Sequence, residues 1–338
     1  MVEPKRHTPL LNGSLKNLFF PPEKDEYRYF HATAGLAFPN SDYLARASWA
    51  ADAAMLCYAR YGPRRMDDDE FAENVKLAGL TLRAKIGENP VDWNAPGTQA
   101  FFATAADFAI LAFRGTEIDD PGDSCDDLDI LLVPEPDYSD ASAAALGHLA
   151  IIGQLFTPLC LVHRGFQSAL NRVWDQVRRQ LSQYRLERPE AEICLTGHSL
   201  GGALALLAYS RVPDPKISAF TFGCPRVGDS GFARRVAANP GRGHYRFVNE
   251  DDLVAHVPPE SVLYGHAPPQ GYRFDATGRL DPASAEELPA DLAAVRTALR
   301  GLPADFRSHP ETLDQLPAPP CLVDHSVARY CMRIADCV

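Results

Sequence analysis

Short runs of continuous apolar residues alternate along this chain with longer helix-forming segments. The β-prone runs of strand length lie at 98–102, 108–113, 193–196, 217–222 and 245–248, and 108–113 is apolar throughout. The helix-forming segments lie at 43–60, at 166–186 and directly after residue 199. Runs that are apolar throughout are typical of strands buried on both faces. The order of strands and helices therefore predicts an α/β fold, in which helices cover both faces of a mostly parallel sheet.

Two segments show an apolar stripe at helical spacing. In 166–186 the stripe consists of Leu170, Val173, Trp174, Val177 and Leu181. In 288–302 it consists of Leu288, Leu292, Val295, Leu299 and Leu302, and Pro303 breaks the pattern. The second segment is either a helix packed on the body of the protein or a cap that shapes a binding pocket.

The segment 193–203 carries the clearest chemical signal. An apolar run leads into Gly-His-Ser-Leu-Gly at 197–201, and an Ala/Leu-rich run long enough for a helix follows at once. This is the layout of a nucleophile elbow, which presents Ser199 on strained backbone between Gly197 and Gly201. The start of the helix would also direct N–H groups at an oxyanion beside the serine. The alternative interpretation is an ordinary loop with an exposed serine.

A serine nucleophile needs a base, and the base needs a carboxylate that orients it. In enzymes with such an elbow, the acid and then the histidine follow the serine along the chain. The loop after 245–248 offers three adjacent carboxylates, Glu250, Asp251 and Asp252, among which spacing alone does not choose. A solvated acidic turn would look the same. Asp229, after the preceding strand, is a weaker candidate.

Four histidines follow this acidic turn: His256, His266, His309 and His325. His325 is the best placed, because it precedes a predicted C-terminal helix capped by Ser326. A histidine on a loop at a helix entry can reach a serine, although a surface histidine is the alternative interpretation.

An oxyanion hole needs two donors, and Leu200 directly after the serine supplies the first N–H. The second donor should lie on the loop after an earlier strand, and Arg-Gly-Thr at 114–116 fits this place. Gly115 frees the backbone there, so Thr116 can offer both its N–H and its hydroxyl.

Composition narrows the range of partners. The net charge of −11 argues against nucleic acid and against electrostatic docking on anionic membranes. No apolar run approaches the roughly 20 residues of a membrane-spanning helix. The N-terminus lacks the apolar segment of a secretory signal, so we expect a cytoplasmic protein or one secreted by another route.

The eight cysteines lack zinc-like spacing, which predicts reduced thiols. Cys331 and Cys337 are the pair to examine for a disulfide.

Five ordered motifs make the chain resemble the class 3 lipases, typified by triacylglycerol lipases of filamentous fungi. They lie at 113–116, 162–166, 196–203, 221–229 and 248–259, and Asp-His-Ser at 324–326 completes them. Together they cover roughly residues 98 to 275 and 318 to 332. The resemblance implies an α/β-hydrolase fold in which Ser199 is the nucleophile, Asp252 the acid and His325 the base.

The resemblance also implies an oxyanion hole formed by Thr116 and Leu200. The implied activity is cleavage of acyl esters of glycerides through an acyl-serine intermediate, with no cofactor and no metal. A lipid or small ester is the expected substrate, with transient contact at a lipid interface and no stable membrane insertion. The rival interpretations are a phospholipase A or lysophospholipase, including a delivered lipase effector, and a catalytically inactive binding module.

The expected organisation is an extended N-terminal arm at 1–40 and a single catalytic domain at 41–338. A lid at 117–162 and a cap insertion at 280–318 are expected within this domain. The chain departs from the family at 117–129, where aspartates cluster without a basic residue. This segment is either a solvated loop or a calcium site. The Ala-rich and then apolar segment 141–162 is then the alternative lid.

Overall fold

The structure of the protein is a computed structural model. It describes residues 43–60, 66–88, 97–105, 107–115, 131–136, 160–258, 263–267, 271–281 and 320–338. The expected arm at 1–40, the amphipathic segment 288–302, the acidic segment 117–129 and Thr116 lie outside these residues. The expected lid and cap insertion lie outside them for most of their length.

A sheet of eight strands forms the centre of the described part of the chain, in the order β1-β2-β3-β6-β7-β8-β9-β10. Its strands are β1 (Thr81–Gly87), β2 (Gln99–Thr104), β3 (Phe108–Phe113), β6 (Glu192–His198), β7 (Ile217–Phe222), β8 (His244–Asn249), β9 (Gly271–Phe274) and β10 (Leu280–Asp281). The pairings from β3 through β9 are parallel, and those at both edges are antiparallel. The predicted α/β-hydrolase fold with a mostly parallel sheet is therefore confirmed.

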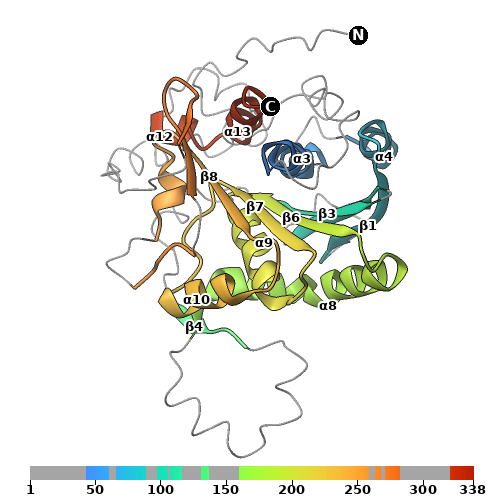
Figure 1. Cartoon of the computed structure of the whole chain (residues 1–338), viewed down its shortest axis with the longest axis horizontal. Coiled ribbons are helices and arrows are strands. Elements are labelled where there is room, and N and C mark those ends of the chain that lie inside the picture. Colours follow the sequence, from blue (N-terminus) through green and yellow to red (C-terminus); the bar gives the residue numbers. More distant parts are fainter. Residues whose placement is uncertain are drawn as a thin grey trace, which may run out of the picture.

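Helices cover both faces of this sheet (Figure 1). One face carries α3 (Tyr43–Leu56), which continues into η2 (Cys57–Arg60), together with α4 (Asp68–Leu77) and α13 (Val327–Ala335). The other face carries α8 (Arg164–Glu187), α9 (Leu200–Arg211) and α10 (Ser230–Ala238). The described part also contains η3 (Leu253–His256), α12 (Pro320–Val323) and a two-stranded sheet of β4 (Leu132–Pro134) and β5 (Leu161–His163).

Successive side chains of each strand point to opposite faces of the sheet, so the core consists of two layers. On β3, Phe108, Ile110 and Ala112 face the layer that contains α3 and α13. Ala109, Leu111 and Phe113 face the layer that contains α8 and α9. Both sets are buried, which explains why the strand is apolar throughout.

The predicted helix at 166–186 corresponds to α8, and its apolar stripe is buried against this second layer. The C-terminal helix is present as α13, with Ser326 in its N-cap position. The Ser326 side chain makes no capping hydrogen bond, so the predicted cap is wrong in this respect. The described cysteines, including Cys331 and Cys337, are free thiols. Across the described segments, no helix combines the length and the apolar character needed to cross a bilayer.

The register of the parallel strands determines where the site lies. Phe113 at the end of β3 is opposite Gly197 of β6, and His198 is opposite Phe222 of β7. The carboxyl ends of these strands therefore meet at one edge of the sheet, which is where open α/β sheets place their ligand sites.

Candidate active site

Ser199 occupies the sharp turn between β6 and α9. Its backbone has φ 58° and ψ −130°, a strained conformation for a residue with a side chain. Its N–H donates to the Phe222 carbonyl at 2.9 Å, and the residue is partly exposed. This is the geometry of a nucleophile elbow, as the sequence predicts.

Two glycines allow this turn to be so tight. A Cβ on Gly197 would lie 2.2 Å from the backbone of Gly201. A Cβ on Gly201 would lie 2.2 Å from the carbonyl oxygen of Phe113 and 2.9 Å from the nitrogen of Gly115. The first turn of α9 therefore packs directly on the end of β3.

The same packing sets the start of α9, with the first expected oxyanion donor, against Gly115 just beyond the end of β3. Leu200 is the first residue of α9, so its N–H belongs to the unpaired N–H groups of the helix start. Thr116 follows directly on Gly115 in the chain and lies outside the described residues.

Asp252 and His325 form a buried pair, although 73 residues separate them. His325 Nδ1 lies 2.9 Å from both carboxylate oxygens of Asp252, which is fully buried. Asp252 also accepts the Val254 N–H at 2.9 Å, as the N-cap of η3. Burial opposes the charge of Asp252, but His325 and two hydrogen bonds outweigh it and hold the pKa below its ordinary value. Asp252 is thus a carboxylate at neutral pH, and it directs Nδ1–H toward itself.

His198, the residue before the serine, contacts the main chain of His325. Its Nε2 lies 2.6 Å from the His325 carbonyl oxygen, and the two rings are 4.4 Å apart. A carbonyl accepts, so Nε2–H donates, and Nδ1 accepts from the Tyr58 hydroxyl at 3.0 Å. Burial, together with the charge of His325, lowers the pKa of His198 to about 3. His198 is therefore a neutral link between the elbow and the histidine turn.

The other candidate carboxylates have different partners. Glu250 binds Arg333 at 2.5 Å, and the exposed Asp251 binds Arg273 at 2.9 Å. Asp229 caps α10 by accepting the Phe232 N–H, so the weaker acid candidate is wrong.

His325 is the histidine that the structure brings to Asp252. His256 belongs to η3 and His266 to the loop 263–267, where burial lowers the pKa of each imidazole. His309 lies outside the described residues. Within the described ranges, no three His, Cys, Asp or Glu side chains gather as metal ligands would.

Comparison with known proteins agrees with this geometry. Residues 110–262, which contain the elbow and the acidic turn, match the family described as Lipase (class 3). Over these residues the chain is similar to the class 3 lipases.

Named relatives show how far this likeness extends. The chain is 37% identical over 124 residues to "Secreted mono- and diacylglycerol lipase 1" of Fusarium solani, covering 36% of each protein. It is 28% identical over 291 residues to "Phospholipase A1-II 4" of Oryza sativa subsp. japonica, covering 72% of the chain and 67% of that protein. The chain spans about a third of the length of the fungal lipases that it matches in sequence.

Solved structures support the fold. The Rhizomucor miehei lipase in complex with its propeptide superposes with a TM-score of 0.53 at 20% identity. The superposition covers 76% of this chain and 78% of that protein. Such a likeness shows that the two proteins share the α/β-hydrolase architecture.

Two contributors to the site were not predicted. Tyr330 of α13 donates its hydroxyl to Asp252 Oδ2 at 2.5 Å and accepts the Asn249 N–H at 2.9 Å. Gly223 has φ 55°, and a Cβ there would lie 2.6 Å from Asp252 Oδ2 and 2.9 Å from His325 Nδ1. Tyr330 could have been found from the sequence. A tyrosine within an apolar helical stripe indicates a buried hydroxyl, which needs a hydrogen-bond partner. The closeness of Gly223 depends on tertiary structure alone.

Proposed function

We propose that this protein is a class 3 lipase, a serine carboxylester hydrolase that cleaves acyl esters of glycerides. Ser199 is the nucleophile, His325 the base and Asp252 the acid. The observation that carries the proposal is the buried Asp252–His325 hydrogen bond, in a turn whose backbone contacts the residue before Ser199. The class 3 lipase family, and the names of its fungal relatives, favour lipid esters as substrates.

The reaction follows from the placement of the proton donors and acceptors. Asp252 orients Nδ1–H, so His325 Nε2 takes the proton of the Ser199 hydroxyl while Oγ bonds to the ester carbonyl carbon. Leu200 N–H and Thr116 stabilise the resulting oxyanion. The carbon–oxygen bond to the alcohol then breaks, and the alcohol leaves with the proton from His325. Water then gives a proton to the same imidazole while its oxygen bonds to the acyl carbon. The bond from this carbon to Ser199 Oγ breaks, Oγ takes the proton back from His325, and the carboxylic acid leaves.

Hydrolysis assays test this assignment. The wild-type protein is given p-nitrophenyl butyrate, mono-, di- and triacylglycerols, and phosphatidylcholine with matched acyl chains. We expect Ser199→Ala to abolish hydrolysis of every ester that the wild type cleaves, with its circular dichroism unchanged. Ser230→Ala, which removes an exposed hydroxyl at the start of α10, serves as the matched control. Retained hydrolysis of p-nitrophenyl butyrate by Ser199→Ala would refute the proposal.

A phospholipase A activity is the second candidate function. It is favoured by the likeness to the rice protein named "Phospholipase A1-II 4", which extends over 72% of this chain. The same triad and chemistry would serve it, since the scissile bond is again an acyl ester. Faster release of fatty acid from phosphatidylcholine than from diacylglycerol would support this candidate over the glyceride lipase.

A further inference from the structure

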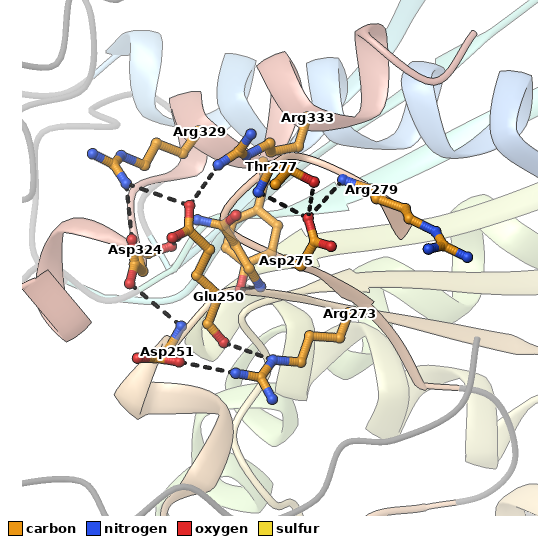
Figure 2. A network of polar contacts seen from close by, with 11 residues as sticks. Glu250, Asp251, Arg273, Asp275, Thr277, Arg279, Asp324, Arg329 and Arg333 are labelled. Carbon is orange, nitrogen blue, oxygen red and sulfur yellow. Dashed lines mark hydrogen bonds and ion pairs between the residues drawn. The ribbon is translucent and has the colours of Figure 1, made fainter. Parts of the chain in front are cut away.

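Three carboxylates, those of Glu250, Asp251 and Asp324, lie beside Asp252 and His325 in the chain, and each is bound by an arginine (Figure 2). Arg329 Nη1 lies 2.8 Å from Asp324 Oδ1, and Arg333 Nη2 lies 2.5 Å from Glu250 Oε1. Arg329 Nη1 also lies 4.0 Å from Glu250, so it interacts with both carboxylates. The exposed pair of Asp251 and Arg273 completes the group.

These contacts connect the two turns that carry the acid and the base. Asp324 directly precedes His325, and its side chain accepts the Asp251 N–H at 3.3 Å. The Asp324 carbonyl oxygen accepts from the Asn249 side chain at 3.0 Å. Asp324 therefore joins the turn of residues 249–252 to the turn of residues 324–326.

One helix supplies the cations for Asp324 and Glu250. Arg329 and Arg333 are four residues apart on α13, so they lie on the same face of the helix. The opposite face is buried in the core, and Tyr330 reaches Asp252 from there. The position of α13 is thus coupled to both catalytic turns.

The surroundings of Asp324 make its negative charge unfavourable. Burial and the neighbouring Glu250 raise the pKa of Asp324 to about 6, while Arg329 opposes this rise. His325 itself is faced by Asp252 and by His198 of β6, and Tyr330 contacts both of these residues. Without the arginines, two more carboxylates near Asp252 would add negative charge around His325.

We propose that Arg329 and Arg333 are positioning residues of the triad. They hold Asp324 and Glu250 against α13, which keeps the base-bearing turn on the acid-bearing turn. They also balance the negative charge of these two carboxylates, so that Asp252 remains the main negative charge that acts on His325. This inference rests on the proposed hydrolase function.

The test is the pH dependence of ester hydrolysis. The parameters kcat and KM for p-nitrophenyl butyrate are measured from about pH 5.5 to about pH 9, where the acidic limb of kcat/KM reports protonation of the base. In Arg329→Gln the loss of a positive charge favours the protonated imidazole, so the acidic limb moves up by about half a pH unit. We expect kcat on the plateau to fall about fivefold, with KM within about twofold of wild type. Arg333→Gln should change both parameters in the same direction.

Charge-matched variants separate this role from a loss of fold. Arg329→Lys keeps the charge and should restore the limb to its wild-type position. Asp324→Asn removes a negative charge and should move the limb to lower pH, a test that holds even if Arg329→Gln does not fold. Combining Asp324→Asn with Arg329→Gln should return the limb to near wild type.

Arg83→Gln is the control, since it breaks an exposed ion pair with Glu187 far along the sheet and should leave the profile unchanged. An unmoved limb and an unchanged kcat in Arg329→Gln and Arg333→Gln would overturn the inference. So would a limb in Asp324→Asn that stays in place or moves to higher pH. A wild-type protein that cleaves no ester would instead refute the proposed function.

Discussion

Burial and pairing give three consecutive acidic side chains different environments. Glu250 and Asp251 reach arginines at the protein surface, whereas Asp252 is turned inward and fully buried. A buried carboxylate is stable only with strong partners, and His325, Tyr330 and the Val254 N–H provide them. A change of one position along this turn therefore changes the chemistry of the side chain completely.

The contrast between neighbours gives a prediction at this scale. Asp252→Asn should lower kcat by roughly 10³–10⁴-fold, because an amide no longer holds Nδ1–H of His325 in the required tautomer. Asp251→Asn removes an exposed ion pair and should change kcat by less than about threefold. Steady-state hydrolysis of p-nitrophenyl butyrate measures both. The reverse ranking would move the acid to Asp251.

At the scale of elements, the contact between β3 and α9 forms the site. The helix begins directly at Ser199, and its first turn lies on the end of β3. This approach brings Gly201, the residue after Leu200, against the backbone of Phe113, Arg114 and Gly115. Any side chain at Gly201 would force the strand and the helix apart.

We therefore expect Gly201→Ala to lower the free energy of unfolding by about 1–3 kcal/mol, since its Cβ would meet backbone that cannot move aside. The same displacement should lower kcat more than it raises KM. Gly265→Ala is the matched control, because nothing lies within 4 Å of a Cβ there. Urea unfolding and ester hydrolysis are measured on both. Equal stability of the two variants would contradict the packing argument.

At the scale of the whole molecule, buried histidines couple folding to pH. Burial lowers the pKa of both His198 and His244 to about 3, from an ordinary value of 6.5. Below pH 6.5 the unfolded chain binds protons that the folded protein excludes, so the stability falls as the pH falls toward 3. The raised pKa of Asp324 acts in the opposite direction between about pH 6 and its ordinary value of 3.8.

His244 allows this to be measured away from the active site. We expect wild-type stability to be flat above about pH 7.5 and to fall between pH 6.5 and 5, with about 2 kcal/mol of the loss due to His244. His244→Gln keeps a polar group near Thr221 and should reduce the slope by this amount. Urea unfolding at several pH values gives both slopes. Parallel pH curves for the two proteins would show that His244 does not titrate as described.

Local patterns allowed much of the fold to be predicted from the sequence. Strand β3 is apolar throughout because both of its faces are covered, and the spacing of apolar residues in α8 shows its buried stripe. The elbow was also predictable, since strand, glycines, serine and helix are contiguous at 193–211. These features are encoded by neighbouring residues.

Features that depend on distant partners were not predictable from local patterns. Glu250, Asp251 and Asp252 look alike in the sequence, and their differences arise from arginines and a histidine many residues away. The short strands β4, β5, β9 and β10 have too few residues to show a period. The resemblance to class 3 lipases singled out Asp252, and the structure places it against His325.

Covalent labelling tests the central claim most directly. The wild-type protein and its Ser199→Ala and His325→Ala variants are treated with a fluorophosphonate, and the modified peptide is identified by mass spectrometry. We predict that the wild type carries the phosphonyl group on Ser199, that Ser199→Ala is unlabelled and that His325→Ala reacts far more slowly. Labelling at another residue, or equal rates with and without His325, would contradict the account.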